Sequence, residues 1–206
     1  MENKILIYGA SGHAKVVIDN LLSNGEKVHL VIDDNPDIVS VSGIPVLHTA
    51  QMALNATDRL CIAVGNNKIR KELAGRLKTV FALAIHKTAV ISPQATIGDG
   101  TVIMANAVIN PGSSIGAHCI INTSAVVEHD CTIADFVHIS PAAALAGGVS
   151  VGEGTHIGIG ACIIQGIRIG NWAMIGAGAV IIADIPDFAV VVGNPGRIIK
   201  YTEGGE

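Results

Sequence analysis

The sequence contains few aromatic and few charged residues. Of its 206 residues, 3% are aromatic and 15% are charged, whereas 50% are hydrophobic and 24 are glycine. A disordered chain carries more charge and fewer aliphatic residues, and a coiled coil carries more charge and less glycine. The scarcity of charge and of aromatic rings therefore excludes both classes. It predicts a folded protein with a core of Ile, Val, Leu and Ala.

Long apolar runs and basic runs are missing as well. Mean hydropathy is +0.52, but polar residues and glycines interrupt every stretch before it reaches the roughly 18 residues of a membrane-spanning helix. The N-terminal residues lack the layout of a signal peptide. Because the net charge is -4, nucleic acid is an unfavourable partner. We therefore expect neither a membrane nor a nucleic acid as partner.

Cysteine is scarce, and its spacing indicates neither a disulfide framework nor a metal motif. The four cysteines are Cys61, Cys119, Cys131 and Cys162. No CxxC or HxxxH pair occurs, so we predict no metal site. We interpret the cysteines as reduced core residues of a cytoplasmic protein.

Residues 1–80 show the alternation of a small α/β unit. Apolar runs at 5–8, 28–32 and 60–64 predict strands, since each ends at a glycine or an Asp-rich turn. Apolar residues at helical spacing predict helices over 14–22 and 66–78. This order predicts a parallel sheet, and its length is enough for half of a Rossmann fold only.

From residue 85 the pattern changes to a period of six. Aliphatic residues occupy every sixth position from Ile85 to Ile181 without a gap, and each is followed four residues later by a small or β-branched residue. A period of six is typical of a parallel β-helix, in which three hexapeptides form one triangular coil of roughly 18 residues. Ile91 to Val180 then gives about five coils around one aliphatic column. We predict an α/β half-Rossmann (βαβ) domain over 1–84 and a β-helix with a C-terminal cap over 85–206.

His129 is the strongest candidate for a catalytic residue. It lies at the third position of its hexapeptide, on an outer edge of the predicted solenoid, between Glu128 and Asp130. An imidazole with a pKa near neutrality can take a proton from an attacking amine. A carboxylate bonded to one ring nitrogen raises the basicity of the other. A solvated histidine at a turn is the alternative that the residues alone leave open.

The segment 9–13, Gly-Ala-Ser-Gly-His, follows a predicted strand and opens a helix, where backbone N–H groups can bind a phosphate. Asp33 lies about 20 residues later, where an acidic residue can meet a ribose hydroxyl. Ser11 replaces the middle glycine of GxGxxG, so the motif alone is a weak signal for a dinucleotide. NAD is the competing ligand, but half of a Rossmann fold suits a mononucleotide that carries a sugar better. Asn66 and Asn67 can cap the following helix. His118 and His156 have no motif around them, and we expect both at the surface.

These motifs together resemble the hexapeptide acyltransferase superfamily, and within it the nucleotide-sugar N-acetyltransferases of the PglD type, with the NeuD-type sialic acid O-acetyltransferases as near relatives. The resemblance covers nearly the whole chain, through residues 8–13, 33–34, 63–67, 85–86, 122–124, 128–131, 136–140 and 192–196. It implies a left-handed β-helix, a homotrimer with active sites at subunit interfaces, and acetyl-CoA as co-substrate.

The resemblance also implies roles for individual residues. His129 would be the general base and Asp130, where the family usually has Glu, its orienting carboxylate. The nucleotide sugar would be bound by Ser11, Gly12, His13, Asp33, Asp34 and Gly65. Acetyl-CoA would be bound by His138, Ile159 and Ala177, with Arg197 and Lys200 as candidates for its phosphates.

We therefore predict an acetyl-CoA-dependent N-acetyltransferase that acts on a nucleotide-linked amino sugar, with a UDP-4-amino-4,6-dideoxy sugar as the expected substrate. Two alternatives keep an enzyme but change the acceptor: O-acetylation of sialic acid, or N-acetylation of GDP-perosamine. A third is a non-catalytic β-helix scaffold with a nucleotide-sensing domain.

Overall fold

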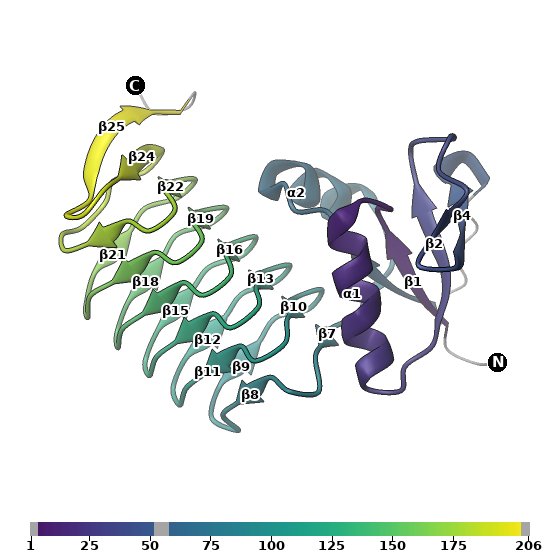
Figure 1. The fold of residues 1–206 in the computed structure, drawn as a ribbon, viewed down its shortest axis with the longest axis horizontal. Helices are drawn as coiled ribbons and strands as arrows, with labels where there is room; N and C mark the ends of the chain where they lie inside the picture. The colour runs from purple at the N-terminus through teal and green to yellow at the C-terminus, as the bar shows by residue number, and fades with distance from the viewer. Residues whose placement is uncertain (1–3, 52–57, 203–206) are drawn as a thin grey trace.

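A computed structural model describes residues 4–51 and 58–202, which form an N-terminal α/β part and a long solenoid (Figure 1). The N-terminal sheet has the strand order β3-β4-β2-β1-β5-β6. Its strands are β1 (Ile5–Tyr8), β2 (Val28–Asp33), β3 (Ser40–Val41), β4 (Ile44–His48), β5 (Arg59–Ile62) and β6 (Val80–Phe81). Its helices are α1 (Gly12–Ser23), α2 (Asn67–Arg76) and the single turn η1 (Thr49–Gln51).

Successive side chains of β1 point to opposite faces of the sheet, and each face is covered by a helix. Ile5 and Ile7 pack with α1 on one face, whereas Leu6 and Tyr8 pack with Leu73 of α2 on the other. The predicted strands at β1, β2 and β5 and both helices are confirmed, and those strands pair in parallel. The antiparallel β3–β4 pair was not predicted, since its strands are short and mostly half-exposed.

The solenoid is built from two-residue strands that recur every six residues. They are β7 (Ala84–Ile85), β8 (Val90–Ile91), β9 (Thr96–Ile97), β10 (Val102–Ile103), β11 (Val108–Ile109), β12 (Ser114–Ile115), β13 (Ile120–Ile121), β14 (Val126–Val127), β15 (Thr132–Ile133), β16 (His138–Ile139), β17 (Ala144–Leu145), β18 (Ser150–Val151), β19 (His156–Ile157), β20 (Cys162–Ile163), β21 (Arg168–Ile169), β22 (Met174–Ile175) and β23 (Val180–Ile181). β24 (Ala189–Val192) and β25 (Arg197–Tyr201) close the end as an antiparallel pair.

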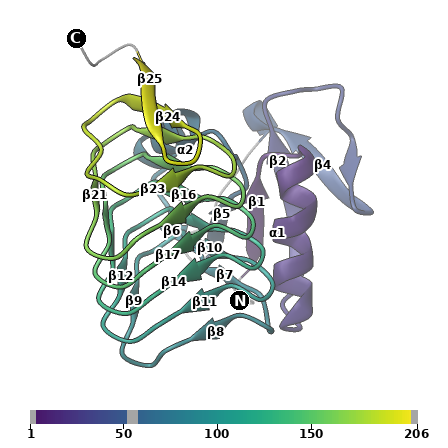
Figure 2. The ribbon, with the colours of Figure 1, turned by 60° about the vertical axis from the view of Figure 1, so that its left-hand side comes forward.

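The strands form three parallel sheets, which are the faces of a triangular prism (Figure 2). Face 1 runs from β7 through β10, β13, β16, β19 and β22 to β24 and β25. Face 2 runs from β8 to β23, and face 3 from β9 to β21. Each strand pairs with the strand one coil later, as Ile121 pairs with Ile139. The second residue of each strand points inward, and these aliphatic side chains form the predicted column.

The two parts share buried contacts. Asn20 of α1 is 1% exposed, and its Nδ2 donates to the Ile103 carbonyl at 3.0 Å. Val102 and Met104 of the solenoid belong to the same apolar cluster as α1. No helix within the described ranges is long and apolar enough to cross a membrane.

The solvent exposure of three side chains differs from the sequence prediction. Cys162 is exposed, because it is the first residue of β20 and points outward, whereas the other three cysteines are buried. His118 is buried, since Phe81 of the N-terminal part packs edge-on against its ring at 4.5 Å. In α2 the predicted apolar position Ile69 is 47% exposed, and Arg70 lies buried instead.

Truncation of the aliphatic column is expected to destabilise the fold. Leu145 is 0% exposed and belongs to the continuous core of the solenoid. Leu145→Ala should lower the free energy of unfolding by about 2–5 kcal/mol, because it leaves a cavity. Urea denaturation measures this, with Val126→Ala, on the outward side of the same face, as the control. Equal losses in both variants would contradict the inward column as the source of stability.

Candidate active site

The carboxyl ends of β1 and β2 carry a network of polar side chains. The Tyr8 hydroxyl donates to the Asp34 carboxylate at 2.9 Å and accepts from Arg76 at 2.7 Å. Asp33 accepts from the Ala10 N–H at 2.6 Å and from the Asn35 N–H at 2.8 Å. Asp33 thus holds the 9–13 turn in place. Asp34 lies exposed beside it, with a pKa lowered mainly by the hydrogen bond from Thr49.

The turn before α1 is open to solvent. Ser11 and Gly12 are exposed, and the Ser11 side chain makes no capping hydrogen bond. Gly9 has φ +105, and a Cβ there would lie 2.9 Å from the Ala63 carbonyl oxygen, so this position requires glycine. Because a helix leaves its first N–H groups without carbonyl partners inside the helix, the exposed start of α1 is suited to an anion.

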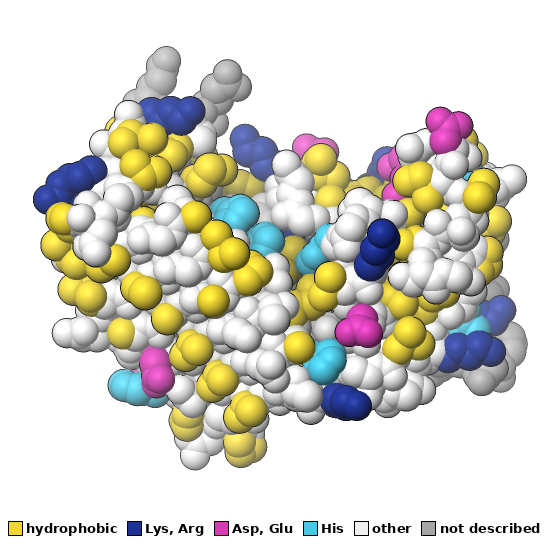
Figure 3. Space-filling model, in the orientation of Figure 1, with side chains coloured by type: hydrophobic (Ala, Val, Ile, Leu, Met, Phe, Trp, Pro, Cys, Tyr) yellow, Lys and Arg dark blue, Asp and Glu magenta, His cyan; other side chains and the backbone are white. Residues whose placement is uncertain are grey.

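Three imidazoles meet where this part faces the solenoid. His138 and His156 are the first residues of β16 and β19 on face 1. Their rings stack, with the two ring centroids 4.6 Å apart. Burial lowers the pKa of His138 to about 3 and that of His13 to about 4, with Arg70 adding to both effects. The backbone of Gly65 lies close enough to act on the His138 ring. Figure 3 shows histidines gathered in the hollow between the two parts.

The hydrogen bonds of His138 fix its tautomer. Asn122 Oδ1 accepts from the Thr123 N–H at 2.8 Å, so Asn122 Nδ2 is the atom that donates to His138 Nε2 at 3.0 Å. A neutral ring that accepts at Nε2 carries its proton on Nδ1. That Nδ1 is buried and has no hydrogen-bond partner within the described part of the chain. The Gly65 backbone lies beside the ring, so His138 Nδ1 faces the N-terminal part of the molecule.

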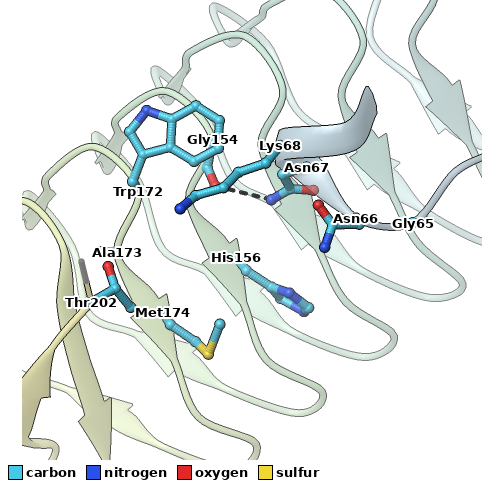
Figure 4. A pocket seen from close by; sticks show the side chains of 10 residues that line it. All are labelled: Gly65, Asn66, Asn67, Lys68, Gly154, His156, Trp172, Ala173, Met174 and Thr202. Carbon is cyan, nitrogen blue, oxygen red and sulfur yellow. Dashed lines mark hydrogen bonds between the residues drawn. The ribbon is translucent and has the colours of Figure 1, made fainter. Parts of the chain in front are cut away.

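A cavity of about 220 Å³ opens beside these rings, between the start of α2 and face 1 (Figure 4). Its lining comprises Gly65, Asn66, Asn67, Lys68, Gly154, His156, Trp172, Ala173, Met174 and Thr202. His156 is half-buried here, its Nε2 2.7 Å from the Ser140 hydroxyl, so its expected surface position is wrong. Asn66 caps α2 as predicted, by accepting from the Ile69 N–H at 3.1 Å.

His129 lies on a different corner of the prism. It follows β14 of face 2 and precedes β15 of face 3, and its side chain is 63% exposed. Its Nδ1 lies 2.8 Å from Asp130 Oδ2, and this hydrogen bond is the main cause that raises the His129 pKa. The ring packs over Gly147 of the next coil, where a Cβ would lie 2.6 Å from Nε2. Glycine there leaves room for the imidazole.

The corner between faces 2 and 3 is opposite face 1, so one protomer does not bring His129 and His138 into a single site. Ile159 and Ala177 are exposed at the corner between faces 1 and 2, on adjacent coils. The Gly178 N–H donates to the Ile159 carbonyl there at 2.8 Å. The predicted site residues thus fall into three groups. His138 faces the N-terminal part, Ile159 and Ala177 lie at the corner between faces 1 and 2, and His129 and Asp130 lie at the corner between faces 2 and 3.

With His129 in the general-base role that the sequence predicts, its raised pKa implies a shifted pH profile of the rate. A general base works only when it is unprotonated, so a raised pKa moves the acidic limb of kcat/KM upward from its ordinary position. Asp130→Asn should move that limb to lower pH and reduce the plateau, because the neutral amide no longer favours the charged ring. Asn is tolerated at the Asp130 φ of 59, so the backbone should not change. An unchanged limb in Asp130→Asn would contradict this coupling.

Comparison with known proteins agrees with both halves of the architecture. Residues 4–77 match the PglD N-terminal domain, and residues 94–129 match the bacterial transferase hexapeptide repeat. A solenoid of this kind behind such a domain defines a hexapeptide transferase. Among the described residues, no three metal-ligating side chains gather.

Solved structures extend the likeness over almost the whole chain. A histidine mutant of perosamine N-acetyltransferase from Caulobacter crescentus, in complex with CoA and GDP-perosamine, is 39% identical with a TM-score of 0.91, covering 97% of this chain and 98% of that one. The acetyltransferase domain of PglB from Neisseria gonorrhoeae is 40% identical with a TM-score of 0.90, covering 96% and 100%. The chain therefore belongs to the PglD-type family of hexapeptide acetyltransferases, with their left-handed parallel β-helix.

A curated relative is UDP-N-acetylbacillosamine N-acetyltransferase from Bacillus subtilis, which is 45% identical over 110 residues. That match spans 49% of this chain and about half of the relative, 51% of its length.

Proposed function

We propose that the protein is an acetyl-CoA-dependent N-acetyltransferase that acts on the amino group of a nucleotide-linked amino sugar. The observation that carries this proposal is the contact of His129 Nδ1 with Asp130 Oδ2 at 2.8 Å. This contact orients an imidazole on an exposed corner of a β-helix of the hexapeptide acetyltransferase type. The relatives support the substrate class, since one is named UDP-N-acetylbacillosamine N-acetyltransferase and another, perosamine N-acetyltransferase, was solved in complex with GDP-perosamine. A UDP-4-amino-4,6-dideoxy sugar remains our expected acceptor.

The N-terminal part would bind the nucleotide sugar at the carboxyl ends of its strands. Ser11 and Gly12 would meet a phosphate at the start of α1. Asp34 would accept from a sugar or ribose hydroxyl, while Asp33 positions the turn through the Ala10 N–H. His13 and Gly65 would approach the sugar from the side of face 1.

Acetyl-CoA would lie along the solenoid. Ile159 and Ala177 form an exposed apolar edge suited to the pantetheine arm, and His138 would meet the thioester end. Arg197 and Lys200 of β25 are exposed cations that would meet its phosphates.

In the reaction, the sugar amine attacks the thioester carbonyl carbon, and His129 Nε2 takes the proton that the nitrogen loses. The oxyanion of the adduct would be stabilised by a backbone N–H. The C–S bond then breaks, and the imidazolium of His129 returns its proton to the departing thiolate. The products are an acetamide and the CoA thiol.

Because His129 and face 1 lie apart in one protomer, a neighbouring protomer would complete each site. We propose a homotrimer in which His129 of one subunit meets the bound substrates of the next. We place the enzyme in the cytoplasm, where its co-substrate is made and where the free cysteines stay reduced.

A thiol-release assay tests the proposal with acetyl-CoA against UDP-, GDP- and dTDP-linked amino sugars and free sialic acid. Turnover should occur with a nucleotide-linked amino sugar, and we expect the UDP-linked acceptor to give the highest kcat/KM. Preference for a GDP-linked acceptor would favour the perosamine alternative. Turnover with sialic acid alone would overturn N-acetylation, and no turnover with any acceptor would favour a scaffold.

A further inference from the structure

Arg70 of α2 is a cation buried without a carboxylate partner among the residues that the structure describes. It is 1% exposed, and it is the largest of the fully buried side chains. Burial lowers its pKa to about 10, so the guanidinium still carries its charge at neutral pH. An apolar residue would fill the same space at a lower desolvation cost. The presence of a charged arginine at this buried position therefore needs an explanation other than packing.

The guanidinium donates to both parts of the molecule. Toward the loop after β5, Nη1 donates to the carbonyls of Val64 at 2.9 Å and Gly65 at 3.3 Å. Toward the solenoid, Nε donates to the His118 carbonyl at 2.8 Å and Nη2 to the Phe136 carbonyl at 2.9 Å. One rigid planar group thus fixes the distance between the loop and two coils.

Asn67 extends the same connection by one coil. Its Oδ1 accepts from Arg70 Nη2 at 2.8 Å, and its Nδ2 donates to the Gly154 carbonyl at 3.0 Å. His118, Phe136 and Gly154 occupy equivalent corners between faces 3 and 1 on successive coils, all with positive φ. The loop 64–67 is therefore tied to a row of backbone carbonyls that the solenoid holds rigidly.

We infer that Arg70 is a positioning residue that sets the distance between the nucleotide-sugar site and the acetyl-CoA site. This inference rests on the proposed function, in which Gly65 faces the sugar and His138 faces the thioester. The Gly65 carbonyl accepts from Arg70 Nη1, and the Gly65 backbone also lies close to the His138 ring. Movement of the loop would separate the amine from the thioester while each substrate still binds, and misalignment of this kind lowers kcat rather than affinity.

Arg70→Met keeps an unbranched apolar stem, although a shorter one, and loses all of the donors. We expect kcat, normalised to folded protein, to fall about 30-fold or more, while the Kd for CoA and the Kd for the nucleotide sugar change less than about threefold. Arg70→Lys should recover little, because one ammonium cannot reach the loop and both corners together. Lys71→Gln is the matched control, since the Lys71 ammonium pairs with Glu153 and lies over the rings of Phe136 and Trp172. It should keep kcat within about threefold.

A purely structural role would lower the melting temperature and leave the normalised kcat unchanged, and that result would overturn the inference. Full recovery by Arg70→Lys would overturn it too, because charge alone would then suffice. If Arg70→Met does not fold, Asn67→Ala removes one arm of the same connection and should show the same separation of kcat from Kd. Hydrogen exchange of residues 64–67 without substrates should rise in these variants, which tests the hold on the loop even if the wild type shows no turnover.

Discussion

His129→Ala should lower kcat by about 10²-fold or more while the protein still folds and binds CoA. The imidazole is 63% exposed and its only polar side-chain partner on the described surface is Asp130, so its removal leaves no buried group unpaired. The loss should therefore fall on catalysis alone. Steady-state kinetics with the preferred amino sugar, together with CoA titration and a melting curve, measure the three quantities separately.

A matched variant sharpens this test. Glu128→Gln removes the other carboxylate beside His129, which acts on the ring only through its charge. We expect it to keep kcat within about tenfold of the wild type, because the Asp130 hydrogen bond remains. If His129→Ala and Glu128→Gln lose equally little, His129 is not the general base.

The solenoid could be predicted from the sequence because its constraint is local and repeated. Every sixth side chain must fill the same triangular core, and Ile121, Ile139 and Ile157 do so on successive coils of face 1. The His129–Asp130 contact was predictable for the same reason, since the residues are adjacent and lie on a turn whose position the period fixes.

The buried histidines needed information from distant parts of the chain. His118 is covered by Phe81, and His13 meets face 1 only after the N-terminal part has docked. One signal was available, however: His138 and His156 are separated by one coil, and each precedes an inward isoleucine. That register predicts stacked rings on one face. The burial of Arg70 had no such signal, because its partners are backbone carbonyls, which every sequence supplies.

Trimers that carry both His129→Ala and His138→Ala protomers should recover activity that neither variant has alone. On one protomer the two rings lie on opposite sides of the prism, and the proposed site therefore takes His129 from one subunit and His138 from its neighbour. In a cyclic trimer each interface joins the same two surfaces. Any mixed trimer then contains one interface with both histidines, and it should show about a third of the wild-type kcat per trimer.

Co-expression with two different affinity tags, followed by purification on both, isolates the mixed trimers. The parent variants and a doubly tagged wild type, purified in the same way, set the two limits of the assay. If both histidines served one site within a single protomer, no mixed trimer would contain an intact site, and its activity would equal that of the parents. Recovery therefore distinguishes a site shared between subunits from one completed within a protomer, because only the shared site needs the corner of one prism to meet face 1 of the next.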